Sequence, residues 1–232
     1  MKPPRGTRLS QRHPSETQRL TALLTPPVVR TLPPTVAIPT PTPTAFPMPR
    51  LWTRKEFEKL HGSGLLEGRR AVLLQGVIYE EGRITPSEAT SVSLVAEWLD
   101  RSFPTGHDVR CLLPLDLGAA TEPLPDVVLV RGSVRDYTAN HPTPADVVLL
   151  VEVADTTLSF DQTTKAELYA AAGVVEYWVL DVLNRRLTVM RQPTPLPPGG
   201  YAYLSITTFQ PTDSVAPLAA PNSPVLVSDL LP

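Results

Sequence analysis

The fold of this chain is decided by residues 146–155, which read Asp146-Val147-Val148-Leu149-Leu150-Val151-Glu152-Val153-Ala154-Asp155. A nearly continuous run of Val and Leu is typical of a central strand that is covered on both faces. An ionised carboxylate inside such a run is costly unless it meets a cation, hydrogen-bond donors or a proton. Glu152 therefore indicates either a structural ion pair, for which Arg131 and Arg191 are the candidates, or a functional site.

Helices and strands are expected on both sides of this central strand. Apolar residues at i, i+3, i+4 and i+7 predict two amphipathic helices, the first with Ser87 as its N-cap and the second with Asp161 as its N-cap. The succession of strands, helices and further strands predicts an α/β (α+β) fold in which helices flank a mixed sheet. The expected elements are a short helix capped by Thr53, strands around a turn at 75–76, a helix at 87–103, strands at 108–114, 126–131 and 147–153, a helix from 162 to a stop at Gly173, a hairpin over 176–191, a strand at 201–209 and a docked apolar segment at 225–231.

The N-terminal segment, residues 1–49, has a different composition from the rest. It holds 12 of the 28 prolines, six of the 21 Lys and Arg residues and a single acid, Glu16. Each proline removes an amide donor and restrains the residue before it, which predicts a disordered tail with local polyproline II character. An inert tail is the first interpretation, and a phosphate-binding basic arm and a transit peptide are the alternatives. Residues 50–232 are then expected to form one domain.

Charge and cysteine content limit the classes of function. The whole chain carries a formal charge of -2, so nothing global indicates a polyanionic partner. Cys111 is the single cysteine, which excludes an internal disulfide and a thiolate zinc site and fits a reducing compartment. No apolar run approaches the roughly 20 residues that a membrane-spanning helix needs. A cytoplasmic protein without a membrane partner is expected.

Asp126 is the second residue that could carry chemistry. It follows Pro125 and begins another strand rich in Val and Leu, residues 126–131. If this strand neighbours the central one, the carboxylates of Asp126 and Glu152 converge, and two hard oxygen donors suit Mg²⁺ or Mn²⁺. Taken alone, Asp126 is better interpreted as an ordinary residue of a strand-initiating turn than as a metal ligand.

Lys165 is the third residue that could carry chemistry. It shares one helix face with Leu168, Tyr169 and Ala172, so this lysine lies on the apolar stripe that should face the sheet. An amine in that position could orient an attacking water molecule and offset the charge that develops on a phosphate. A side chain that bends outward to solvent from the first helical turn is the structural alternative.

Several segments of the sequence, taken in their order and spacing, resemble a known family. They are Pro125-Asp126-Val127-Val128, Leu150-Val151-Glu152-Val153, Asp161 with Lys165, Tyr169-Ala170-Ala171-Ala172-Gly173-Val174, Glu176-Tyr177-Trp178 and Asp181. Together they resemble the Uma-two family, a branch of the PD-(D/E)XK nuclease superfamily with the restriction-endonuclease-like fold. The resemblance covers residues 51–191 and extends toward the C-terminus.

This resemblance implies a restriction-endonuclease-like core and a metal-dependent endonuclease that hydrolyses nucleic acid, with DNA as the expected substrate. It implies Asp126, Glu152 and Lys165 as catalytic residues, with Mg²⁺ or Mn²⁺ held by Asp126 and Glu152. The lysine of the parent superfamily stands two residues after the acid, where this chain has Ala154, and the Uma-two pattern places it on the following helix, which matches Lys165.

Two departures from the family pattern leave a second function open. The family's early-strand Glu is replaced by Val72, and Glu88 stands where a His usually opens the first long helix. Glu88 is therefore a candidate third metal ligand, or an acid that stabilises the helix N-terminus. The alternative to an active nuclease is a catalytically impaired module that keeps the fold and binds a partner or nucleic acid.

Other chemistries are weakly indicated. The four histidines show no metal-binding spacing, and neither a nucleophile elbow nor a Gly-rich phosphate loop is present in the sequence. Trp178 is expected to pack in the core, and Tyr169 is a weaker candidate for substrate contact. A hairpin that ends at Arg191 could expose a sheet edge, so a homodimer is a further expectation.

Overall fold

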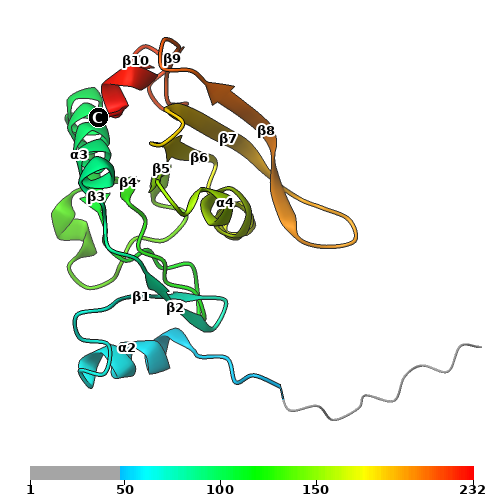
Figure 1. The fold of residues 1–232 in the computed structure, drawn as a ribbon. Coiled ribbons are helices and arrows are strands. Elements are labelled where there is room, and N and C mark those ends of the chain that lie inside the picture. The colour runs from blue at the N-terminus through cyan, green and yellow to red at the C-terminus, as the bar shows by residue number, and fades with distance from the viewer. Residues whose placement is uncertain (1–47) are drawn as a thin grey trace, which may run out of the picture. The chain divides into compact units, whose positions relative to one another are not determined.

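A computed structural model describes residues 48–232, so that nearly all of the expected N-terminal tail lies outside the described residues (Figure 1). Residues Pro49–Pro232 form one compact unit. Its centre is a six-stranded sheet with the strand order β3-β4-β5-β6-β7-β8, in which β5 and β6 are parallel and the other neighbours antiparallel. The mixed sheet is as the sequence predicts. Its strands are β3 (His107–Cys111), β4 (Val127–Arg131), β5 (Val147–Ala154), β6 (Glu176–Asp181), β7 (Arg186–Pro195) and β8 (Tyr201–Phe209).

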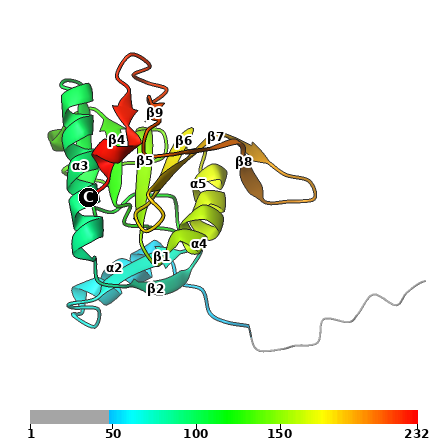
Figure 2. The same ribbon diagram turned by 45° about the horizontal axis from the view of Figure 1, so that its top comes forward.

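Helices cover both faces of this sheet. The long helix α3 (Pro86–Ser102) packs on one face, and the segment α4 (Leu158–Phe160), η2 (Asp161–Lys165) and α5 (Ala166–Ala171) packs on the other (Figure 2). Alternate residues of β5 face the two sides, so Val151 and Val153 pack toward α3 whereas Leu150 and Ala154 pack toward α5. The central strand is therefore covered on both faces, and Glu152 points to the α5 side.

Three short elements close the α3 face from the C-terminal end of the chain. They are β9 (Ser214–Val215), β10 (Val225–Leu226) and the 3-10 helix η3 (Val227–Leu230), and they confirm the expected docked segment. Glu176 holds them to the sheet, because its buried carboxylate accepts hydrogen bonds from the Leu218 amide (2.7 Å), the Trp178 indole (3.0 Å) and the Arg191 guanidinium. Arg191 thus pairs with Glu176 and not with Glu152.

A separate hairpin stands beside the main sheet. It consists of β1 (Arg70–Leu74) and β2 (Val77–Glu81), which pair around Gln75 and Gly76 as the sequence predicts. Both turn residues have positive φ (50° and 81°), and a Cβ at Gly76 would lie 2.7 Å from that of Leu51. Glycine is therefore required there. The helix α2 (Arg54–Gly62) packs Phe57 against this hairpin and begins with the predicted Thr53 and Glu56 capping box.

Two helix starts differ from the sequence prediction. The N-cap of α3 is Thr85, not Ser87, and Pro86 occupies the first turn, where its missing amide costs nothing. The second helical segment begins at Leu158, one turn earlier than expected, so Asp161 is not its N-cap but a buried residue inside the segment. The Gly173 stop is confirmed, with φ 82°.

The free edge of the sheet also differs from the prediction. β7 continues through Pro193 to Pro195 and is covered along its length by β8, so the hairpin that reaches Arg191 exposes no edge. In the described part of the chain, β8 and β3 are the edge strands. No helix among residues 48–232 is long and apolar enough to cross a membrane.

Arg131, the other arginine considered as a partner of Glu152, does not form that ion pair either. Arg131 donates to the Ala145 carbonyl (2.8 Å) and does not pair with Glu152. The cation that meets Glu152 comes from the helical segment instead.

Candidate active site

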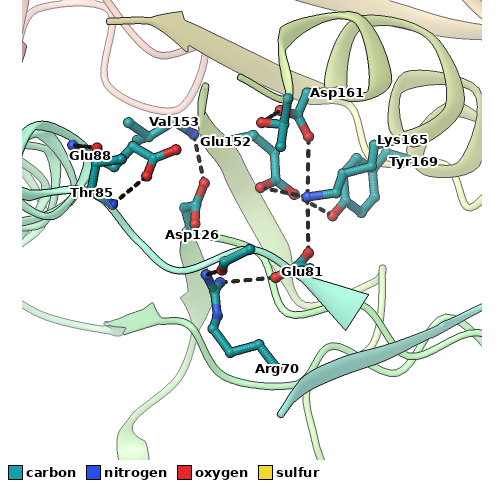
Figure 3. A network of polar contacts seen from close by, with 12 residues as sticks. Arg70, Glu81, Thr85, Glu88, Asp126, Glu152, Val153, Asp161, Lys165 and Tyr169 are labelled. Carbon is teal, nitrogen blue, oxygen red and sulfur yellow. Dashed lines mark hydrogen bonds and ion pairs between the residues drawn. The ribbon is translucent and has the colours of Figure 1, made fainter. Parts of the chain in front are cut away.

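The two candidate metal-binding carboxylates lie next to each other at one end of β4 and β5. β4 pairs with β5 so that Val127 is opposite Val151, and one further step along each strand brings Asp126 opposite Glu152. Both side chains point to the α5 face. Asp126 is fixed by the Val153 amide, which donates to its Oδ2 at 2.8 Å (Figure 3). The convergence expected from sequence is therefore present.

Glu152 is 1% exposed, and both of its carboxylate oxygens have a partner. Oε1 accepts a hydrogen bond from the Tyr169 hydroxyl at 2.7 Å, and Oε2 lies 3.1 Å from the Lys165 Nζ. Tyr169 is fully buried, which excludes the substrate contact considered for it and makes it the residue that orients Glu152. Burial and the neighbouring Glu152 raise the pKa of Tyr169 well above its usual value, so its hydroxyl keeps the proton that it donates.

Lys165 is 6% exposed, and its ammonium lies among three carboxylates. Besides Glu152, it is 3.2 Å from Asp161 Oδ1 and 3.4 Å from Glu81 Oε1. Burial alone would lower the pKa of Lys165, but the surrounding carboxylates raise it above its ordinary value, so the lysine stays charged. The amine is therefore turned inward to the site rather than outward to solvent.

A widened helical turn presents Lys165 and Asp161 to the same space. The η2 segment is a π-helix, a rare element that is frequent at functional sites. Asp161 is 1% exposed and accepts a hydrogen bond from Thr157, while its Oδ1 has only the ionic contact with Lys165. Burial and then the charge of Glu152 raise the pKa of Asp161.

Glu81, at the end of β2, is a site residue that the sequence prediction missed. Its carboxylate contacts Lys165 and also accepts from Arg70 Nη2 at 2.9 Å (Figure 3). The only sequence signal is the symmetric placement of Arg70 and Glu81 about the Gln75-Gly76 turn, which makes them cross-strand partners. Their approach to Lys165 depends on how the hairpin packs against the helical segment.

The Glu152 carboxylate raises the proton affinity of its neighbour Asp126. Burial first, and the charge of Glu152 second, raise the pKa of Asp126 well above its usual value, although the Val153 amide and Lys165 act in the opposite direction. The half-buried Asp126 and the buried Glu152 lie side by side, and a cation beside them would favour their charged forms.

A pocket of about 290 Å³ opens over this cluster. Asp126, Val153 and Lys165 line it from the sheet and the helical segment, and the β1–β2 hairpin lines it from the other side. Val72, which stands where the resemblance implies a Glu, is 2% exposed and also lines the pocket. A carboxylate therefore reaches this space from Glu81 on the neighbouring strand, and not from position 72.

Ala154 and Trp178 are both buried, the first at the position of the parent superfamily's lysine and the second in the core. Ala154 is fully buried on the same face as Glu152, and Lys165 supplies from the helical segment the amine that this position lacks. Trp178 is fully buried and stacks on Trp98 with ring centroids 5.6 Å apart, so it packs in the core as expected.

Glu88 lines the pocket, but its side chain already caps the N-terminus of α3. Its Oε2 accepts from the Thr85 amide at 2.7 Å, and Thr85 Oγ1 accepts from the Glu88 amide at 3.2 Å, which together form a capping box. This arrangement favours the interpretation as a helix-capping acid over that of a third metal ligand.

The substitution Glu88→Gln separates the two roles, because glutamine keeps the capping box and removes the charge. We expect Mg²⁺ affinity, measured by calorimetry, to change by less than about twofold and thermal stability to stay the same. A loss of affinity of about tenfold or more, the scale set by loss of a supporting metal-site group, would make Glu88 a ligand.

The donor set fits a hard divalent cation. Asp126 accepts the Val153 amide with Oδ2 and lines the pocket, and Glu152 lies opposite it on β5. Within residues 48–232 no group of three or more His, Cys, Asp or Glu side chains is arranged to hold a metal ion. Mg²⁺ matches a site of two carboxylates, since it usually keeps several waters and takes substrate phosphate as a further ligand.

This sheet, with two acids at the end of its central strands and a lysine over them, defines a nuclease fold of the restriction-endonuclease-like class. A family model described as "Putative restriction endonuclease" matches residues 54–223. The chain belongs to this family, Uma2.

A solved structure supports the fold. The crystal structure of a protein from Anabaena variabilis, described as "a putative nuclease", superposes with a TM-score of 0.55 and 14% identity over 69% of this chain and 88% of that one. A search of curated proteins found no match.

Proposed function

We propose that this domain is a metal-dependent nuclease whose catalytic residues are Asp126, Glu152 and Lys165. The observation that carries the proposal is the meeting of the buried Lys165 ammonium and the buried Glu152 carboxylate with Asp126 beside them. Asp126 and Lys165 both line the pocket. In this proposal Asp126 and Glu152 hold Mg²⁺ or Mn²⁺. The bound ion supplies an activated water and a Lewis acid for the phosphate.

The side chains of the protein would position the attacking water and stabilise the charge on the phosphate. Lys165 Nζ would hold the attacking water in line and offset charge on the phosphate oxygens. Tyr169 fixes one oxygen of Glu152, and Asp161 and Glu81 fix the position of the ammonium. Positioning of this kind supports catalysis because each group is held before the substrate arrives.

This proposal is more specific than the family assignment about the substrate and the cellular location. The family description favours nucleic acid, and we propose DNA as the main substrate. A cytoplasmic location stays a prediction from the single cysteine.

The test is Mg²⁺-dependent cleavage of plasmid, single-stranded DNA and RNA by the wild-type chain and by Glu152→Gln. Glutamine keeps the size of the buried side chain and removes the charge, so we expect cleavage to fall by about three orders of magnitude. The matched control is Glu97→Gln, an exposed α3 carboxylate, which should cleave like the wild type. Equal rates for Glu152→Gln and the wild type would refute the proposal.

The second candidate is a nuclease-fold module that has lost turnover and binds a partner or nucleic acid. It is favoured by the ion pairs that already surround Lys165 and by the excess of acidic residues in 50–232, where 22 Asp and Glu stand against 15 Lys and Arg. Calorimetry with Mn²⁺ discriminates the two, since an active site should bind the ion and an impaired module need not.

The homodimer also stays a prediction, but its expected edge moves to β8. That strand holds nine residues without a charge or a proline, whereas the opposite edge, β3, carries Asp108 and Arg110. Charged residues protect an edge strand against pairing, so β8 is the less protected edge. Sedimentation of the full chain would measure the oligomeric state.

A further inference from the structure

Two aromatic side chains line the same pocket as the catalytic candidates. Tyr79 comes from β2 and Phe160 from α4, and their ring centroids are 5.7 Å apart. Tyr79 is 38% exposed although it points toward a pocket and pairs across the hairpin with the buried Val72. An exposed ring at the wall of this pocket is not explained by core packing.

The hairpin and the residues just after it bring two arginines to the pocket, beside the carboxylates of Glu80 and Glu81. Arg70 and Arg83 both line it. Arg70 is tied to Glu81 and to the Gly82 carbonyl (3.0 Å), whereas the Arg83 side chain belongs to an exposed residue just beyond β2. A cation beside an aromatic ring is the combination with which proteins hold the backbone and bases of an unpaired strand.

The size of the pocket limits what can enter. Its volume of about 290 Å³ is at the lower end for sites that enclose a small molecule. The hairpin and residues 82–85 line one side, and Thr156, Thr157 and Phe160 line the other. The space suits one nucleotide, and a base that is stacked within a duplex could not reach Tyr79 unless it were extruded.

We infer that the substrate is an unpaired nucleic-acid strand, one base of which stacks on the rings of Tyr79 and Phe160. This inference rests on the proposed nuclease function and names its substrate class. The phosphate next to the stacked base then lies over Asp126 and Lys165, because all four side chains line one pocket. DNA and RNA strands share this chemistry, and the test separates them.

The test measures binding by fluorescence anisotropy, with Ca²⁺ in place of Mg²⁺ as a hard cation that takes oxygen ligands. The probes are a short thymidine strand, the matching uridine strand and a DNA duplex of the same length. We expect the wild-type chain to bind one or both single strands about tenfold more tightly than the duplex, as one stacked base contributes. Duplex binding as tight as that of both strands would overturn the inference.

The variant Tyr79→Leu should weaken strand binding about tenfold, and Tyr79→Phe, which keeps the ring, should stay within about twofold of the wild type. The matched control is Tyr201→Leu, since Tyr201 is 41% exposed on β8 and does not line the pocket. Replacing one base of the strand by an abasic residue should weaken binding to the wild type but not to Tyr79→Leu. Equal strand affinity for the wild type and Tyr79→Leu would overturn the inference.

Cleavage assays with Mg²⁺ distinguish this inference from the nuclease proposal. Ring-dependent strand binding without any cleavage would refute the nuclease proposal and keep the strand site. Cleavage of duplex plasmid at the same rate by the wild type and Tyr79→Leu would refute the strand inference and keep the nuclease.

Discussion

Replacing Lys165 with methionine is expected to lower the free energy of unfolding by about 3 kcal/mol, the lower end of the cost of breaking a buried ion pair. Methionine fills a similar volume, so the effect comes from the charge. Its removal leaves Glu152 and Asp161 buried without their cation. Urea denaturation measures the change. Loss of cleavage in this variant is therefore evidence of a catalytic role only under conditions where the domain is still folded.

A matched control comes from the exposed face of α3. Arg101 pairs with Glu97 at the same i, i+4 spacing as Lys165 with Asp161, but both side chains of the Arg101 pair are mostly exposed. Arg101→Met should change stability by less than about 0.5 kcal/mol. The double variant Lys165→Met, Glu152→Gln should recover much of the lost stability. If Lys165→Met proved as stable as the wild type, the ammonium would not lie in the carboxylate cluster.

The variant Asp126→Asn should have the opposite effect on stability, raising the free energy of unfolding by about 1 kcal/mol while cleavage falls by about three orders of magnitude. The asparagine oxygen can still accept the Val153 amide, and the repulsion from Glu152 is gone. Urea denaturation without divalent ions, together with a cleavage assay, measures both.

The pH dependence provides an internal control for Asp126. Because its pKa is raised in the folded state, the wild-type domain loses stability as the pH rises from the ordinary value of 3.8 through the raised value. Asp126→Asn lacks this loss. Its higher free energy of unfolding relative to the wild type should therefore be present at neutral pH and vanish below about pH 4. An advantage that is equal at both pH values would mean that the carboxylate charge is not its cause.

The sequence predicts the sheet and most of the site because the decisive signals are local. An acid within an apolar run, an acid at the start of the next strand and a lysine on an apolar helix face each require an unusual environment. The antiparallel pairing of β4 and β5 then needs only the correct register to bring Asp126 and Glu152 together.

The parts that the sequence did not predict depend on packing between distant segments. Nothing near Glu81 in sequence indicates Lys165, since their contact joins a hairpin to a helical segment 84 positions later. Asp161 resembles an N-cap because its type is common there, but the extra helical turn that begins at Leu158 puts it inside the protein. Thr85 was missed as a cap because Pro86 separates it from the apolar pattern.

The packing of the C-terminal segment against α3 limits where this domain can be truncated. The family match ends at residue 223, yet Val225, Val227 and Leu230 are buried against α3 beyond it. A protein shortened to the family boundary would leave the inner surface of that helix open to water, and apolar surface uncovered in this way promotes aggregation. The packed domain is thus longer than the part of the chain that the family model matches.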